Sequence, residues 1–208
     1  MEHSTPRRAT AILVLALACA GCAGGAAVKE AKPPGLLDRA LQVVGLQKSS
    51  PQAAFTQSKT IPLRLYAGTN LNSGTDNKPM ALVVRVYRLR RVERFEQAPF
   101  QAFLDENSER NALGEDLVGV TEMVLQPGQR HEVVERLPPE ASALGVVGLF
   151  RAPAAKRWRL SFDGIKSIKD GVTIGLHACA LTTTSGTALL TQMDGEPYSL
   201  ATARCIGN

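Results

Sequence analysis

The chain has 208 residues, of which 44% are hydrophobic and 21% charged, a balance typical of one globular domain of ordinary size with flanking segments. The formal charge of +5 is spread along the chain, and the densest basic segment (Arg85, Arg88, Arg90 and Arg91) is expected on the solvated face of a sheet. Aromatic residues make up only 5%, so a surface that stacks nucleic-acid bases is not indicated.

The first 22 residues have the three parts of an export signal. Arg7 and Arg8 give a positive start, residues 9–20 form an uncharged and mostly apolar run, and small residues close that run. The run is too short for the core of a bilayer, which needs about 20 residues, so it is not expected to span the membrane. We therefore predict a signal peptide over residues 1–21.

Two cysteines at the end of this run are candidates for lipid attachment. Ala20-Gly21-Cys22 resembles the lipobox of bacterial lipoproteins, in which the cysteine takes a diacylglycerol and becomes the new N-terminus. Cys19 stands where leucine is usual, and the four residues that end at Cys19 form a weaker rival box. Acylation of Cys22 leaves Cys179 and Cys205 as an even pair in an oxidising compartment, so Cys22 is favoured and Cys19 is the alternative. A secretory signal with incidental cysteines is the third alternative.

The residues after Cys22 indicate the destination of the protein and a tether. Ala23 and Gly24 lack the aspartate that commonly keeps lipoproteins in the inner membrane, which favours the outer membrane. Residues 22–60 are expected to form a lipidated tether. Within it, residues 35–46 carry an apolar stripe at helical spacing. This stripe predicts a short amphipathic helix, either packed on the domain or lying on a membrane or a partner.

Residues 61–208 are expected to form one β-domain. Apolar segments bounded by turn residues predict seven or so short strands, and a change of spacing predicts a short helix from about Pro99. Pro127-Gly128 is the pair that a type II turn requires, so the strands on either side of it are predicted to form a hairpin. The expected fold class is mainly β, a sandwich with one or two short added helices. The strands are predicted over residues 61–67, 81–89, 116–125, 130–137, 143–150, 158–162, 171–181 and 187–193.

Patterns of catalytic or metal-ligating residues are not found. His131 and His177 share no metal-ligand spacing with each other or with a cysteine, so neither a metal nor another cofactor is expected. Nucleophile-elbow, zinc-protease and phosphate-loop motifs do not occur, and we expect no enzymatic activity. We expect four acidic residues to be solvated loop charges: Glu106, Glu109, Glu115 and Asp116.

The two cysteines of the domain have two alternative states. Cys179 and Cys205 are expected either to form a disulfide, which would tie the C-terminal segment to a core strand, or to remain as buried thiols.

The connection between the first two predicted strands is unusually long. Hairpin loops usually have two to five residues, whereas this segment has about twelve polar and small residues around one apolar residue, Leu71. Such a loop is typical of a binding site, and the alternative is a solvated tip whose leucine packs back on the sheet. The candidate binding residues are Gly68, Thr69, Asn70, Leu71, Asn72, Ser73, Gly74, Thr75, Asp76, Asn77, Lys78 and Pro79.

A series of short motifs follows in order between Ile61 and Phe162. They are Leu71-Asn72, VVRVYRL over residues 83–89, Phe95 with Phe100 to Leu104, LGEDL over residues 113–117, Pro127-Gly128, Val146 to Arg151, and Trp158-Arg159. Together with the lipobox, the series resembles the outer-membrane lipoproteins of the type VI secretion system, the family of TssJ, also called SciN or VasD.

The resemblance implies a fold, a partner and a contact site. The implied fold is a transthyretin-like β-sandwich with added helical elements. The implied role is to anchor the trans-envelope complex of TssJ, TssL and TssM at the outer membrane by binding the periplasmic C-terminal domain of TssM. The family's contact with TssM is attributed to the loop over residues 68–79, with Asn70, Leu71 and Asn72 as the best-placed residues.

Two other classes of protein are the rivals. A transthyretin-like periplasmic lipoprotein that binds a small ligand or glycan would need a concave site lined with aromatic residues. A periplasmic hydrolase would need histidine and acidic residues that converge on one site.

Overall fold

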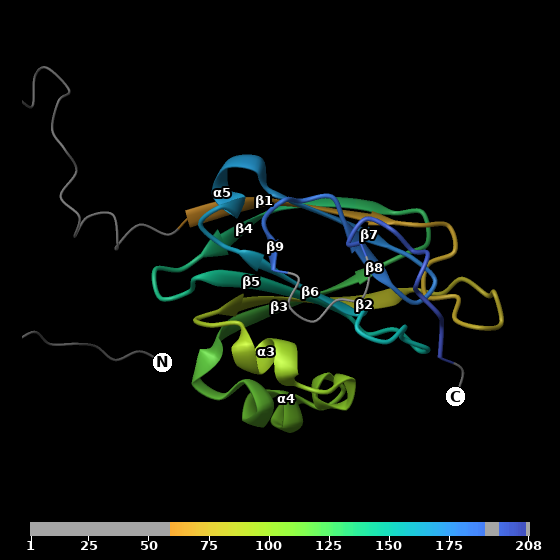
Figure 1. The fold of residues 1–208 in the computed structure, drawn as a ribbon, viewed down its shortest axis with the longest axis horizontal. Coiled ribbons are helices and arrows are strands. Elements are labelled where there is room, and N and C mark those ends of the chain that lie inside the picture. Colours follow the sequence, from red (N-terminus) through yellow and green to blue (C-terminus); the bar gives the residue numbers. More distant parts are fainter. Residues whose placement is uncertain (1–58, 190–195, 207–208) are drawn as a thin grey trace, which may run out of the picture. The chain divides into compact units, whose positions relative to one another are not determined.

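A computed structural model describes residues 59–189 and 196–206 of the chain (Figure 1). The predicted signal peptide, both candidate lipid-attachment cysteines and the helix predicted over residues 35–46 lie outside the described residues. Within residues 59–189 and 196–206, no helix combines the length and the apolarity that crossing a membrane requires. All described residues belong to one compact unit of the chain.

In the part of the chain that the structure describes, nine strands form two sheets that face each other (Figure 1). The four-stranded sheet has the order β4-β1-β7-β8 and consists of β1 (Lys59–Ala67), β4 (Arg130–Leu137), β7 (Val172–Leu176) and β8 (Leu181–Thr183). The five-stranded sheet has the order β3-β2-β5-β6-β9 and consists of β2 (Leu82–Leu89), β3 (Leu117–Leu125), β5 (Ala143–Gly148), β6 (Arg159–Asp163) and β9 (Ala188–Leu189). Neighbouring strands are antiparallel except for β1 and β7. The predicted β-sandwich is confirmed.

Alternating side chains of β1 and β2 form much of the core between the sheets. Ile61, Leu63 and Leu65 of β1 are fully buried, and the residues between them are partly exposed. In β2, Val84 and Val86 are fully buried in the same alternation, and β2 lies between β3 and β5. Full burial of each such side chain contributes about 1.5–3 kcal/mol to stability.

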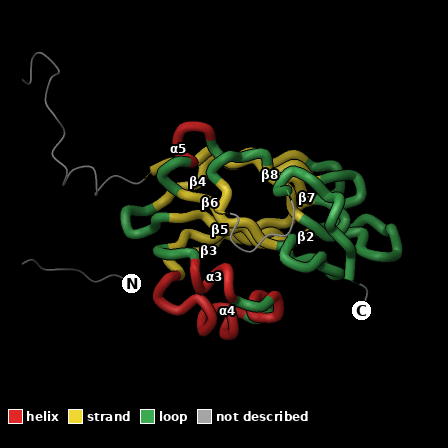
Figure 2. Tube along the Cα trace, viewed as in Figure 1, coloured by secondary structure: helices red, strands yellow, loops and turns green. Residues whose placement is uncertain are grey.

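A helical layer covers the five-stranded sheet on the side away from the core (Figure 2). It contains α3 (Glu93–Gln97), the 3-10 helix η1 (Phe100–Phe103), α4 (Glu106–Leu113) and the 3-10 helix η2 (Gly114–Asp116), whereas α5 (Ser167–Asp170) follows β6. Phe95 of α3 lies directly over Gly145 of β5, where a Cβ atom would be only 2.7 Å from the Phe95 ring. Helical packing on one face, the core on the other and neighbouring strands on both edges together explain why every residue of β5 is buried.

The short helix predicted from about Pro99 is confirmed as η1, which Pro99 precedes, but the prediction missed α3 before it and α4 and η2 after it. Pro99 is extended, with φ −70° and ψ 157°, and separates α3 from η1. Asp105 is also extended and begins α4, since its carboxylate accepts a hydrogen bond from the Ser108 amide at 2.9 Å.

The turn predicted at Pro127-Gly128 forms, but the prediction that the strands on either side of it pair as a hairpin is wrong. Gly128 has φ +76° and the Gln129 amide donates to the Gln126 carbonyl at 3.0 Å, as in a type II turn. However, β3 pairs with β2 and β4 pairs with β1, so the turn crosses from one sheet to the other. Alternation of side chains identifies a strand but not the neighbour of that strand.

The region predicted as one strand over residues 171–181 contains two strands. The chain turns between β7 and β8, where the His177 amide donates to the Ala180 carbonyl at 3.0 Å. The last predicted strand is β9, which covers Ala188–Leu189, and residues 190–193 lie outside the described residues.

Of the four arginines predicted on a solvated face, Arg90 and Arg91 are exposed, but the two arginines of β2 are not freely solvated. Arg85 and Arg88 are about one-fifth exposed, and each is paired with a carboxylate that is almost fully buried. Arg85 contacts Glu109 at 2.5 Å, which fixes α4 to the sheet. Arg88 contacts Glu135 of β4 at 3.1 Å, which joins the two sheets. The ion pairs explain how cations are accommodated on a packed sheet.

Two of the four acidic residues predicted as solvated loop charges are buried. Glu109 is 3% exposed and accepts a hydrogen bond from the Tyr87 hydroxyl at 3.1 Å. Asp116 is 1% exposed and accepts a hydrogen bond from Arg91 at 3.0 Å. Glu106 and Glu115 are exposed as predicted.

Candidate functional site: the crossover loop

The crossover loop, residues 68–81, connects β1 of one sheet to β2 of the other (Figure 1). It lies at the end of the sandwich opposite α5. The turn over residues 126–129 and the β7–β8 turn are its neighbours, since Gly128 donates to the Gly68 carbonyl at 3.1 Å and Gly68 donates to the Leu176 carbonyl at 2.8 Å. The loop is long compared with hairpin loops, and its length is partly explained by the need to cross between the sheets.

Four consecutive residues of the crossover loop, 71–74, are buried. Leu71 is fully buried, Asn72 is 7% exposed and Ser73 is 2% exposed. Leu71 and Asn72 were predicted as contact residues, and their burial shows that they cannot meet a partner without rearrangement. Leu71 was the apolar residue that singled out this loop, and it packs back on the sheets, the alternative that the sequence left open.

Backbone hydrogen bonds hold the buried residues 71–74 against the β7–β8 turn. The Asn72 amide donates to the His177 carbonyl at 3.0 Å, and the Gly74 amide donates to the Ala178 carbonyl at 3.2 Å. The Asn72 side chain donates to the Ala81 carbonyl at 2.9 Å, which closes the loop on itself. Asn72 has φ +48°, a conformation that asparagine tolerates better than most residues.

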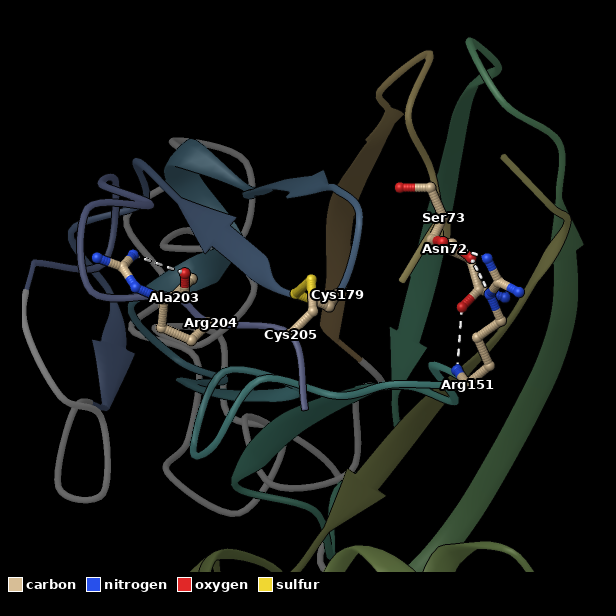
Figure 3. Close-up of a disulfide and its surroundings, with 7 residues drawn as sticks. All are labelled: Asn72, Ser73, Arg151, Cys179, Ala203, Arg204 and Cys205. Carbon is tan, nitrogen blue, oxygen red and sulfur yellow. Dashed lines mark hydrogen bonds between the residues drawn. A yellow bond between two sulfur atoms is a disulfide. The ribbon is translucent and has the colours of Figure 1, made fainter. Parts of the chain in front are cut away.

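Arg151, which follows β5, holds the second half of the loop (Figure 3). Its guanidinium donates to the Asn72 carbonyl at 3.0 Å, the Lys78 carbonyl at 3.2 Å and the Asp76 carboxylate at 3.0 Å. A further hydrogen bond reaches the Ser73 carbonyl. A bidentate pair of this kind fixes both position and orientation, because the guanidinium is planar.

The charge on Asp76 is stabilised by this arrangement. The hydrogen bond from Arg151 and the Lys78 amide, which donates to Asp76 at 3.0 Å, hold the pKa of the Asp76 carboxyl below its ordinary value. Asp76 is therefore ionised at neutral pH, and its charge is balanced by Arg151.

The accessible part of the loop is shorter than predicted. Thr69, Asn70 and residues 75–81 are exposed. Met80, which is 50% exposed, lies outside the range predicted for binding. We define residues 75–80 as the loop tip. It presents polar groups, Pro79 and one flexible apolar side chain on a backbone that is fixed at both ends.

The turn that supports the loop is itself held by a disulfide (Figure 3). Cys179 and Cys205 are bonded, with sulfur atoms 2.08 Å apart. Arg157 also holds the C-terminal segment, since its guanidinium donates to the Glu196 carbonyl at 3.1 Å and to the Ser199 carbonyl. The disulfide therefore joins the C-terminal segment to the β7–β8 turn and, through that turn, to the crossover loop.

Arg151 was missed as a site residue. The sequence shows it only as the last residue of an apolar segment, and its position 75 residues after Asp76 gives no periodic signal of contact. The pairing depends on β5 ending beside the crossover loop, which is a property of the sheet order.

The histidines and carboxylates that the structure describes do not converge on a reactive centre. His177 contacts the Thr182 hydroxyl at 2.8 Å, and burial, aided by Arg157, lowers the pKa of His177. Among residues 59–189 and 196–206, no group of three or more histidine, cysteine, aspartate or glutamate residues could hold a metal ion.

A family model and solved structures match this chain. The model is that of the type VI secretion lipoproteins VasD, EvfM and TssJ, and it covers residues 59–179, from the start of β1 to the first disulfide cysteine. A search of the curated proteins gives no match. The T6SS lipoprotein TssJ1 from Pseudomonas aeruginosa is 26% identical with a TM-score of 0.54, over 62% of this chain and 96% of that chain.

Two other solved structures contain a similar chain. One is described as the type VI membrane complex, and its matching chain is 26% identical with a TM-score of 0.56, over 62% of this chain and 100% of that chain. The other is described as the T6SS protein TssM C-terminal domain (869–1107) from EAEC. Its matching chain is 26% identical with a TM-score of 0.53, over 61% of this chain and 98% of that chain.

Proposed function

Because the chain belongs to the family of type VI secretion lipoproteins that includes TssJ and VasD, we propose that it anchors the membrane complex of that secretion system by binding the periplasmic domain of TssM. In this proposal the loop tip is the contact site, and the protein acts mechanically. The observation that supports it most directly is the crossover loop, whose tip is exposed while Arg151 and the β7–β8 turn fix its base.

The match to the structure named after TssM supports the choice of partner. The aligned 61% of these 208 residues, about 127, makes up 98% of the matching chain, which is therefore about 130 residues long. Residues 869–1107 of TssM number 239. We infer that the matching chain is a separate polypeptide, a relative of this protein that was solved together with TssM.

A fixed loop is suited to this role, because ordering a flexible loop on binding would cost free energy. Each immobilised side chain costs about 0.5–1.5 kcal/mol of binding free energy, and backbone ordering adds to this cost. The hydrogen bonds of Arg151 and Asn72 order the loop before the partner arrives. A single loop gives a small interface, so we expect an affinity on the order of micromolar for one copy, raised by avidity when several copies join one complex.

We further propose that Cys22 carries the lipid, with Cys19 as the alternative, and that the protein resides in the outer membrane and faces the periplasm. The domain plan in this proposal is a signal peptide over residues 1–21, a lipidated tether over residues 22–60 and the β-sandwich over residues 61–208. The tether ends in β1 itself, since β1 begins at Lys59.

The loop assignment is tested by capture of TssM. The processed lipoprotein, purified in detergent, is titrated with the periplasmic domain of TssM in a calorimetric or surface-binding assay. Arg151→Ala removes the hydrogen bonds to Ser73, Asp76 and Lys78, and we expect at least a tenfold weaker affinity because the tip loses its fixed position.

The matched control is Arg110→Ala. Arg110 is also paired with a carboxylate, Glu106, but it lies on α4 in the helical layer. We expect this variant to bind like the wild type. If the Arg151 variant bound TssM as tightly as the wild type, the loop would not be part of the interface. A wild-type protein that never binds TssM would contradict the proposed partner.

A further inference from the structure

An apolar hollow of about 510 Å³ opens on the surface beside the crossover loop. Three separate segments line it. Phe100 and Leu104 come from η1 and the residue that follows it, Leu149 and Trp158 come from the β5–β6 connection, and Ile206 comes from the C-terminal segment.

The lining of the hollow is more apolar than most protein surface. Leu104 is 58% exposed and Ile206 is 54% exposed, although both are large aliphatic residues. Single exposed apolar residues are common, but several that line one concave surface mark an interaction site. The hollow is large enough for one or two large side chains of another molecule.

Packing and a covalent bond preform the hollow. The Trp158 ring packs edge-on against the Phe100 ring with centroids 5.0 Å apart, and the Arg159 guanidinium lies 4.6 Å from the centroid of the Trp158 ring. Ile206 follows Cys205, so the disulfide to Cys179 holds Ile206 at the rim.

The hollow is continuous with the crossover loop through Arg151. Arg151 lines the hollow, and it also lines a second depression that contains Thr75 and Asp76 of the loop tip. A partner bound to the loop tip can therefore also contact the hollow, because the two sites form one continuous surface. The guanidinium of Arg151 is already paired with Asp76, so the hollow offers an incoming group no unbalanced charge.

We propose that the hollow is a second part of the partner interface and takes one or two large apolar side chains of the TssM periplasmic domain. This inference rests on the proposed function and extends it from the polar loop tip to an apolar anchor point. Central apolar pockets of this kind supply much of the affinity of protein interfaces, because the side chain that fills them is fully desolvated. The disulfide then has a role in binding, since it places Ile206.

The test uses the processed lipoprotein in detergent and the periplasmic domain of TssM. Ile206→Asp and Leu104→Asp each place a charge in the hollow from a different segment, and we expect each to weaken binding at least tenfold. Ala155→Trp fills the hollow from its rim and should weaken binding to a similar extent. Thermal unfolding of each variant shows whether the fold is intact, and Ile206 lies on an exposed segment whose substitution should leave it so.

The matched control is Ile165→Asp, because Ile165 is 60% exposed and lies just before α5, at the other end of the sandwich (Figure 1). It should bind like the wild type. If Arg151→Ala weakens binding while all three hollow variants bind like the wild type, the second contact is wrong and the loop proposal stands. If the hollow variants instead change only self-association or binding to phospholipid vesicles, a second copy or lipid occupies the hollow and the inference is overturned. A wild-type protein that does not bind TssM would overturn both proposals.

Discussion

Arginine residues carry much of the long-range polar contact within this domain. Arg159 donates to the carbonyls of Phe95 at 2.8 Å and Ala98 at 2.5 Å, and also to that of Glu96. These carbonyls lie where α3 ends, so they have no partners within the helix. Burial lowers the pKa of Arg159 to about 10, with Glu96 acting in the opposite direction, so the side chain stays protonated at neutral pH. One partly buried cation therefore attaches the helical layer to β6.

His177 makes the loop end of the domain sensitive to mild acid. Burial, with a smaller effect of Arg157, lowers the pKa of His177, so the unfolded chain binds a proton more readily than the folded domain. The stability associated with neutral His177 is present above the ordinary pKa of about 6.5 and is lost as pH falls from there towards the lowered value. We expect the melting temperature to fall between pH 7.5 and pH 5.5, and to fall less in His177→Gln.

The control for this prediction is Ser142→Ala, which lies just before β5 and leaves His177 and its contact with Thr182 in place, so its melting temperature should fall with pH as in the wild type. The measurement is thermal unfolding across that pH range for the three proteins. Parallel curves for the wild type and the His177 variant would contradict the assignment.

The sequence predicted which segments form strands better than it predicted which strands pair in the sheets. The predicted bounds of β4 agree with the structure, because alternation of side chains over residues 130–137 is a local property. The pairing of β3 and β4 across Pro127-Gly128 was wrong, because a type II turn can close a hairpin or carry the chain between sheets. Sheet order depends on the whole core, which local patterns do not describe.

The candidate site was predictable only in part for the same reason. Unusual length and composition identified the crossover loop, but burial of Leu71 and Asn72 depends on both sheets closing over them. The partner of Asp76, Arg151, lies in the segment after β5, 75 residues further along the sequence. Buried ion pairs such as Arg85–Glu109 escape sequence reasoning in the same way, since a charged residue carries no local sign of its partner.

The disulfide connects the stability of the domain to the order of the crossover loop. Cys179 and Cys205 are 26 residues apart, and closing a loop of that length is worth about 3.5 kcal/mol in the chain-entropy model. We expect Cys205→Ser to lower the free energy of unfolding by up to this amount, measured by denaturant unfolding. Hydrogen exchange at the Asn72 and Gly74 amides should also become faster, because both donate to carbonyls of the turn that the disulfide holds.

Ser142→Ala is a useful comparison for this effect. It removes the hydrogen bond that the Ser142 hydroxyl donates to the Arg90 carbonyl, and Ser142 immediately precedes β5. It should change stability slightly and leave exchange at Asn72 and Gly74 as in the wild type. Unchanged exchange at those amides in the Cys205 variant would show that the turn is ordered without the disulfide.

At the scale of the whole molecule, the direction of β1 separates the point of attachment from the point of contact. The chain enters β1 at Lys59 and reaches the crossover loop after Ala67, and nine extended residues span about 30 Å. The segment between Cys22 and Lys59 can extend at most about 130 Å, at 3.3–3.6 Å per residue. A lipid at Cys22 would thus hold the far end of the sandwich and leave the loop tip and the apolar hollow facing away from the point where the tether joins the domain.

This arrangement requires a lipid at the N-terminus, and the two cysteines make that requirement testable. One acyl chain gives only marginal membrane binding, whereas two or three chains together anchor a protein stably, at about 0.8 kcal/mol per buried CH₂ group. We expect Cys22→Ser to move the protein from the outer-membrane fraction to the soluble periplasmic fraction. Cys19→Ser should stay membrane-bound, because in the favoured pathway residue 19 leaves with the signal peptide. Release by Cys19→Ser and retention by Cys22→Ser would assign the lipid to Cys19, and retention of the double variant would show that something other than a lipid holds this domain at the membrane.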